Sequence, residues 1–318
     1  PQLGDPCDVR TVLRTNSATA ASVRTLCLAT GTPTSVIDTY TLDAVSSIPV
    51  VSRGNPNLSP EQAVTKTLGV VWRPTFNSDL FSSLSVSVDY YNIRITDIIG
   101  TVSATNIINK CYNRDGSNPT YSATSVYCTL ITRAPDGTFQ RVLSPYLNLG
   151  TLATDGFDFQ VDWSFGLGAI GLDDKYGRVS IGSVINNTAH YKTQVFADSP
   201  VQDFAGTING SSSPEWRALT TFGYTVGPVG LNLRWRWIPK LDDVTTVTNP
   251  AAVLPGTASY NVFDLGFRWK LGEKYELRGN IANLADRKPN WVSGQPGTTS
   301  AQFDTIGRAY TIGVRASF

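Results

Sequence analysis

The chain has 318 residues, of which 41% are hydrophobic, and its 26 basic and 25 acidic side chains leave a net charge of +1. A chain this close to neutral carries no basic field, so we expect no nucleic-acid partner. The sequence has no run of about 18 apolar residues, which excludes a transmembrane helix but leaves a transmembrane β-barrel open.

Four cysteines lie in two stretches without strand periodicity. Cys7 and Cys27 are 20 residues apart, Cys111 and Cys128 are 17 apart, and His190 is the only histidine. Metal sites usually show closer cysteine spacing or several histidines. Two loop-closing disulfides, Cys7–Cys27 and Cys111–Cys128, fit better than free thiols or a metal, and they imply an oxidising, extracytoplasmic compartment.

From about residue 63 onward, apolar and polar residues alternate with a period of two. The alternation is clear in the stretches 157–165, 229–237 and 263–271. Such a pattern predicts strands with one apolar face. We expect nine strands, at 63–74, 82–98, 142–165, 176–192, 214–226, 229–240, 258–271, 274–284 and 305–318.

A soluble β-sandwich would also have half-buried strands, but three features favour a transmembrane antiparallel β-barrel. The strands are about 10–14 residues long, whereas soluble strands average about 5–6. Aromatic residues bracket smaller ones on the apolar faces, as Trp216 and Tyr224 do, which is typical of membrane-interface girdles. The alternate faces are charged, and burying them in a sandwich would cost several kcal/mol per unpaired charge. These charges include Asp158, Asp162, Arg234, Arg236, Asp264, Arg268 and Lys270.

The connection lengths predict the direction of the strands. Short connections lie at 227–228 and 271–274, and long ones at 100–140, 193–213, 241–257 and 286–304. Outer-membrane barrels have short periplasmic turns and long extracellular loops. We therefore expect residues 1–62 to form an extracellular loop region and residues 63–318 to form barrel strands that end on the periplasmic side.

Five segments in order resemble the TonB-dependent outer-membrane receptors. Residues 54–61 read GNPNLSPE, 88–93 read VDYYNI, 154–158 read TDGFD, 280–286 read NIANLAD, and 307–318 read GRAYTIGVRASF. The last segment is similar to the terminal assembly signal of the family, with Tyr310 and the final Phe318. By its alternation, this strand should present Tyr310, Ile312 and Val314 to lipid, and Thr311 and Arg315 to the lumen.

The resemblance implies a 22-stranded barrel with an N-terminal plug, of which this all-β chain would be about the last nine strands. Nine strands leave two bare edges, which lipid does not tolerate. We therefore expect a separate chain or missing segment to supply the plug and the remaining strands. The chain contains no methionine and starts at Pro1, so we expect a processed chain or a fragment.

The resemblance further implies energy-coupled uptake of a scarce nutrient such as a siderophore, vitamin, oligosaccharide or peptide. The partners would be outer-membrane lipid of a Gram-negative bacterium, the inner-membrane TonB complex acting through the plug, and a small-molecule, sugar or peptide ligand. A passive porin or autotransporter-type barrel is the alternative. We expect no enzyme, cofactor or metal, because no catalytic motif occurs and Asp158 and Asp162 fit lumen-lining charge better than an acid–base pair.

Ligand contacts are expected among rings in or near the extracellular loops, because sugars and aromatic chelators stack on such rings. For each ring, simple packing of the loop is the alternative. The candidates are Tyr121, Tyr127, His190, Tyr191, Tyr260 and Trp291.

Overall fold

The computed structural model describes residues 4–43, 47–197, 199–210, 212–254, 256–290 and 303–317. The chain divides into two compact units, which are described separately. Unit 1 comprises Pro1–Glu61 and Asp97–Leu149, and unit 2 comprises Gln62–Thr96 and Gly150–Phe318. Among the described helices, the longest has ten residues, and none is long and apolar enough to cross a membrane.

Unit 1 is a small mixed fold built on strand β6 (Phe139–Asn148). Strand β1 (Val50–Arg53) pairs with β6 in parallel, while β4 (Ile99–Thr101) and β5 (Ile131–Arg133) pair with it antiparallel. The helices are α1 (Val12–Thr15), α2 (Ala20–Ala29), α3 (Ala104–Cys111) and the 3₁₀ turn η1 (Cys128–Leu130). The pairing of β1 with β6 therefore joins two segments that are far apart in the sequence.

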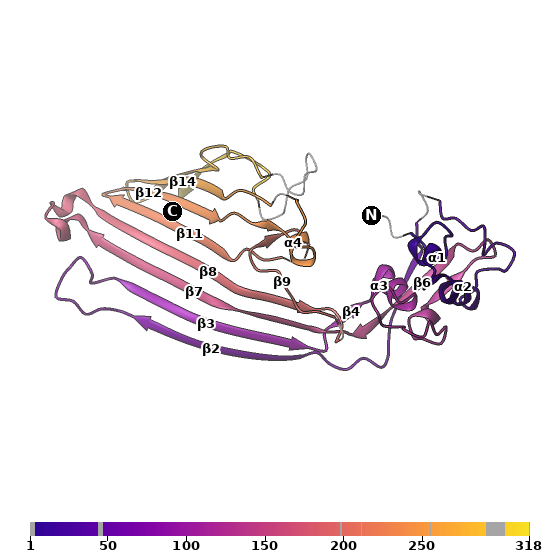
Figure 1. Ribbon diagram of the computed structural model, residues 1–318. Helices are drawn as coiled ribbons and strands as arrows, with labels where there is room; N and C mark the ends of the chain where they lie inside the picture. Colours follow the sequence, from indigo (N-terminus) through magenta and orange to yellow (C-terminus); the bar gives the residue numbers. More distant parts are fainter. Residues whose placement is uncertain are drawn as a thin grey trace. The chain divides into compact units, whose positions relative to one another are not determined.

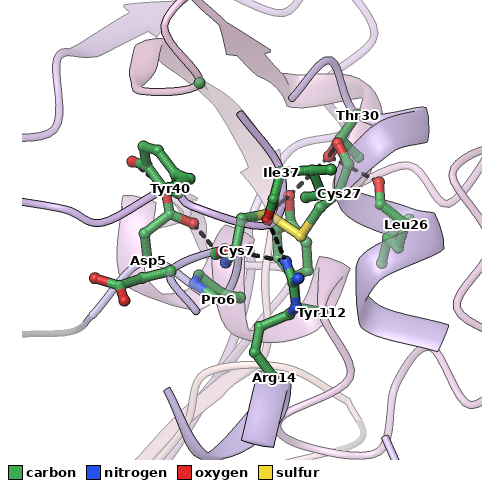
Figure 2. The surroundings of a disulfide bond; sticks show 12 residues. Asp5, Pro6, Cys7, Arg14, Leu26, Cys27, Thr30, Ile37, Tyr40 and Tyr112 are labelled. Atoms are coloured by element: carbon green, nitrogen blue, oxygen red, sulfur yellow. Dashed lines mark hydrogen bonds between the residues drawn. A yellow bond between two sulfur atoms is a disulfide. The ribbon is translucent and has the colours of Figure 1, made fainter. Parts of the chain in front are cut away.

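Both predicted disulfides, Cys7–Cys27 and Cys111–Cys128, are present in unit 1. Cys7 and Cys27 are fully buried, and Figure 2 shows Arg14, Tyr40 and Tyr112 around them. The Arg14 guanidinium donates to the backbone oxygen of Cys7 over 3.2 Å. The disulfide ties the N-terminal segment to helix α2, and Arg14 ties the same segment to helix α1, so the disulfide sits inside a packed core.

A buried ion pair also holds unit 1 together. The Arg133 guanidinium donates to both carboxylate oxygens of Asp5 over 2.7 Å, and both side chains are 0% exposed. The Asp5 carboxylate also accepts a hydrogen bond from the Tyr40 hydroxyl, over 2.9 Å. Because a buried charge is costly unless it is paired and hydrogen-bonded, these residues depend on one another.

Unit 2 is dominated by one antiparallel sheet (Figure 1), whose main path has nine strands in the order β16-β15-β14-β12-β11-β8-β7-β3-β2. Their bounds are β2 Gln62–Trp72, β3 Ser85–Thr96, β7 Thr151–Gly166, β8 Arg178–Gln194, β11 Trp216–Val226, β12 Val229–Ile238, β14 Tyr260–Leu271, β15 Tyr275–Ala282 and β16 Ala309–Ala316. Eight of the nine predicted strands correspond closely to these, and the ninth corresponds in part.

Short elements complete unit 2. Strand β9 (Gln202–Asp203) adds to β8, and β10 (Thr207–Ile208) pairs with β13 (Asp242–Asp243). Helix α4 (Thr245–Thr248) and the 3₁₀ turns η2 (Leu167–Ile170) and η3 (Asp174–Tyr176) lie in connections. One end of the sheet, which we call the turn side, carries the shorter connections 73–84, 167–177, 227–228 and 272–274. The opposite end, which we call the loop side, carries the longer connections between strands.

The predicted strand at 142–165 is wrong, because two strands in different units occupy it. Strand β6 ends at Asn148 in unit 1, and β7 begins at Thr151 in unit 2. The backbone NH of Leu149 donates to Ile98, and that of Gly150 donates to Val195. A Cβ on Gly150 would lie 1.6 Å from the Gln194 oxygen, so only glycine fits this change of partner.

The register separates an apolar face from a polar face, as the alternation predicted. Partners in an antiparallel pair point to the same face: Leu231 is opposite Tyr224 on one side and Phe267 on the other. In the last strand, Ile312 and Val314 are opposite Gly279 and Leu277 on the apolar face, and Thr311 is opposite Asn280 on the polar one. The terminal parity is therefore confirmed for the described residues, which do not include Phe318.

The sheet is open rather than closed into a barrel. Strands β2 and β16 are its two ends, and within the described part of the chain they do not pair with each other. Every residue of β2 is exposed. The two bare edges expected for a partial barrel are therefore present.

Candidate functional site

Three groups of contacting aromatic rings lie along the sheet. On the turn side, successive ring contacts connect Trp72, Phe76, Phe81, Trp163 and Phe165. A second group connects Tyr90, Phe157 and Phe159, at the middle of β3 and β7, with Trp216 at the loop-side end of β11. A third, of Trp235, Trp237 and Phe263, lies near the loop-side ends of β12 and β14. The Trp235 indole NH donates to Asn261, so its polar edge is satisfied.

Charges on the polar face are segregated by sign. Strands β3 and β7 carry Asp89, Asp158 and Asp162, which we call the acidic half. Strands β11, β12, β14, β15 and β16 form the basic half, with Asp264 and Glu276 as its acidic residues. Its cations are Arg217, Arg234, Arg236, Arg268, Lys270, Arg278 and Arg315.

A groove of about 640 Å³ crosses the basic half. Its walls include Arg234, Arg268 and Arg278, and no carboxylate lines it. Asn232, Asn280 and Thr311 contribute neutral polar groups. The groove therefore offers several hydrogen-bond donors and an excess of positive charge, which suits an anionic occupant.

A second cavity, of about 320 Å³, lies nearer the loop side and combines apolar walls with two arginines. Its apolar lining includes Val184, Leu219, Ile238 and Val262. Arg217 and Arg236 also line it, together with Tyr260. An apolar cavity with a few convergent polar groups is the usual form of a small-molecule site.

Arg236 is held in place by two carboxylates. Its guanidinium donates to Asp264 over 3.1 Å and forms an ion pair with Asp304 over 3.5 Å. Its Nε–H is buried and finds no hydrogen-bond partner among the residues that the structure describes. A buried donor without a partner is costly, so a ligand acceptor at this atom would be favoured.

A third cavity, of about 720 Å³, lies between the connections 195–215 and 239–259. Its lining includes Asp203, Glu215, Trp216, Lys240 and Asp242. Although burial opposes it, hydrogen bonds from the Tyr191 backbone and the His190 ring hold the pKa of Asp203 below its ordinary value. The mixed charge of this cavity points to no particular ligand class.

The structure separates the six predicted ligand residues. Tyr121 and Tyr127 belong to unit 1, and His190, Tyr191 and Tyr260 to unit 2; Trp291 lies outside the described residues. By register, His190 is opposite Asp155, on the side of the sheet that carries Phe157, whereas Tyr191 is opposite Thr154 on the other side. His190 and Tyr191 therefore face in opposite directions.

Three of these rings make structural contacts with their surroundings. The His190 Nδ1 atom is 2.7 Å from Asp203, which belongs to β9. Tyr260 is 4% exposed and packs with Phe303 and Leu241. In unit 1, the Lys110 ammonium lies 5.4 Å from the centre of the Tyr127 ring. Of the five rings that the structure describes, Tyr260 alone lines one of the two polar-face cavities.

Sequence reasoning did not select Arg217, Arg278 or Leu219 as site residues. Their place on the polar face and their adjacency across strands come from the register. No group of three or more histidine, cysteine, aspartate or glutamate side chains suited to a metal occurs among the described residues.

Structures of iron-compound receptors share this fold. A ferric enterobactin receptor of Pseudomonas aeruginosa (PfeA), solved as a mutant with enterobactin, superposes with a TM-score of 0.54 at 15% identity over 85% of this chain. The siderophore receptor PirA of Acinetobacter baumannii gives 0.50 at 15% identity over 84%. The iron transporter FrpB of Neisseria meningitidis gives 0.52 at 11% identity over 84%.

In each case the chain spans about a third (33%) of the neighbour's length. Among curated proteins, none is detectably similar in sequence. A family model described as TonB dependent receptor-like, beta-barrel, matches residues 21–284. Since this is well over half of the sequence, the chain belongs to the TonB-dependent receptor family, as part of its β-barrel.

Proposed function

We propose that this chain forms part of the β-barrel wall of an outer-membrane receptor, and that the receptor takes up an iron chelate in a TonB-dependent way. The observation that carries the proposal is the family match over residues 21–284. The three structural neighbours are a ferric enterobactin receptor, a siderophore receptor and an iron transporter, which favours an iron chelate over a vitamin, oligosaccharide or peptide.

In this proposal the apolar face contacts outer-membrane lipid of a Gram-negative bacterium. Leu68, Ile312 and Val314 on this face are 70–76% exposed in the chain alone, which favours a lipid environment over water. The polar face then lines the lumen. Unit 1, which includes most of residues 1–62, lies outside the cell, where its disulfides are stable.

The remaining receptor parts also belong to the proposal. A plug and further strands, from another chain or segment, close the open edges, and the plug connects the receptor to the inner-membrane TonB complex. Tyr310 and Phe318 act in assembly as part of the terminal signal.

We further propose that the ligand is anionic and contacts the cavity at Arg217 and Arg236. Ferric catecholates combine aromatic rings with negative charge, which suits two guanidiniums beside an apolar wall. The six rings Tyr121, Tyr127, His190, Tyr191, Tyr260 and Trp291 remain proposed ligand contacts, with Tyr260 favoured because it lines this cavity.

The test is uptake of labelled ferric enterobactin by iron-limited cells with and without the gene, in TonB-active and TonB-inactive backgrounds. We expect uptake only in cells that have both the gene and an active TonB complex. A receptor that conducts ions steadily in planar bilayers and imports without TonB would instead be a passive pore.

A binding assay tests the proposed contacts. Arg217→Gln or Arg236→Gln should each weaken binding of the ferric catecholate roughly tenfold or more, as expected for a lost charge-assisted hydrogen bond. Arg178→Gln is the matched control, because Arg178 lies on the polar face and its side chain donates to Ser164 alone among the described residues. If all three variants bind the ferric catecholate with equal affinity, this cavity does not contact the ligand.

A further inference from the structure

The polar face carries two pairs of like charges directly opposite each other. In the acidic half, Asp89 of β3 is the register partner of Asp158 of β7. In the basic half, Arg268 of β14 is the partner of Arg278 of β15. Like charges directly opposite in an antiparallel pair are destabilising, so each pair needs an explanation.

Neighbouring side chains relieve these pairs only in part. Arg278 forms an ion pair with Glu276, on its own strand. Asn186 donates to Asp158 over 2.7 Å. Among the described residues, no ion pair involves Asp89, Asp158 or Arg268.

Glycines beside both pairs leave open space on the polar face. Gly69 is opposite Asp89, and the Asp89 carboxylate reaches over it to 2.0 Å from where a Cβ would lie. Gly230 is opposite Arg268, whose guanidinium lies 3.6 Å from the corresponding point. Gly313 is opposite Arg278 and has nothing within 4 Å. The charged groups therefore lie over or beside glycines, where no side chain blocks the approach of another molecule.

We propose that the polar face is covered by a protein segment with a bipolar charge distribution. Its carboxylates face Arg268 and Arg278 in the basic groove, and its lysines or arginines face Asp89 and Asp158. The inference rests on the proposed function, in which a plug occupies the lumen, and it adds the charge pattern and orientation of that plug relative to these strands.

The presence of both signs favours a protein segment over a transported ligand. An anionic chelate would neutralise Arg268 and Arg278 but would leave the Asp89–Asp158 pair without a counter-charge. A ligand also leaves the receptor, whereas the like-charged pairs are permanent. Only an occupant that carries both charges and stays in place satisfies both pairs.

The sign of a stability change tests the proposal in the receptor purified with all its parts. If no occupant is present, Asp158→Asn and Arg268→Gln each remove a repulsion without breaking an ion pair, and should raise the Tm. If the occupant pairs with these residues, each should instead lower the Tm, by about 2–4 °C. The control Arg178→Gln removes a polar-face arginine that has no like-charged register partner, and should leave the Tm unchanged.

Cross-linking provides a second test that does not depend on charge variants folding. A photo-reactive residue at position 311 lies in the basic groove, and one at position 87 lies next to Asp89 on the same face of β3. We expect the first to capture peptides rich in Asp and Glu, and the second to capture peptides rich in Lys and Arg.

A rise in Tm for both charge variants, no captured peptide, or captured peptides of the reverse polarity would overturn the inference. If TonB-dependent uptake persists alongside such results, only the bipolar occupant is wrong. If uptake does not depend on the gene, the proposed function fails independently of the cross-links.

Discussion

Unit 1 and the sheet of unit 2 are stabilised in contrasting ways. Unit 1 has its own buried core, with Ile107, Tyr112 and Val142 at 0% exposure, and two disulfides that close it. The sheet exposes both edges and much of its apolar face, and its main buried cluster lies on the loop side around Leu241 and Val262. The difference teaches that unit 1 carries its stabilising contacts within the chain, whereas the sheet needs surroundings to supply them.

The largest expected effect is on the buried ion pair of unit 1. Arg133→Ala would leave the Asp5 carboxylate buried without its partner, which should cost about 3–5 kcal/mol. Hydrogen exchange in the intact receptor should show faster exchange in helix α3 and unchanged exchange in strand β11. Arg24→Ala is the control: Arg24 and its partner Asp38 are 42% and 61% exposed, so the loss of this surface pair should leave hydrogen exchange in helix α3 unchanged.

Removing a disulfide tests whether unit 1 is closed by its own cross-links. Replacing Cys7 and Cys27 together by Ser should destabilise unit 1 by about 3 kcal/mol, if the disulfide acts by restricting the unfolded chain. Limited proteolysis should then cut within residues 4–43 while the strands of unit 2 stay protected. Protection of both regions at the wild-type level would mean that the core alone is sufficient.

A charge on the apolar face tests the dependence of the sheet on lipid. Leu233→Arg should cost about 2–4 kcal/mol in a bilayer, because Leu233 lies on the apolar face near the middle of β12. Asn232→Gln, one residue away on the polar face, adds no charge to the basic groove and should change stability little. Denaturant titration of the receptor in lipid vesicles measures both, and equal effects would contradict the assignment of the faces.

The smallest expected effect is the response of unit 1 to acid. A hydrogen bond from Arg10 holds the pKa of Asp8 at about 2, below its ordinary value of 3.8. A carboxyl whose pKa is lower in the folded state stabilises that state above its unfolded pKa. This contribution should be present above about pH 4 and fall away toward pH 2, and Asp8→Asn should remove that pH dependence from hydrogen exchange near Leu42.

Part of the site could be predicted from the sequence because period-two alternation records the side of a strand on which each residue lies. The polar-face position of Arg234, Arg268 and Asp158 followed from this alone. The alternation does not record which residue is opposite which. The Asp89–Asp158 and Arg268–Arg278 pairs, and the cavity at Arg217 and Arg236, therefore depend on the register.

The sequence by itself determined eight of the nine strand regions of the sheet, the cysteine pairing and the faces of the described residues in the last strand. These are local properties, set by alternation, spacing and composition. Only the tertiary structure decided that β6 belongs to unit 1 while β7 belongs to unit 2, and that segments on either side of β2 and β3 build one disulfide-closed unit. Pairing between distant segments depends on backbone hydrogen bonds, which every residue except proline can make, so the sequence pattern alone does not specify the partner.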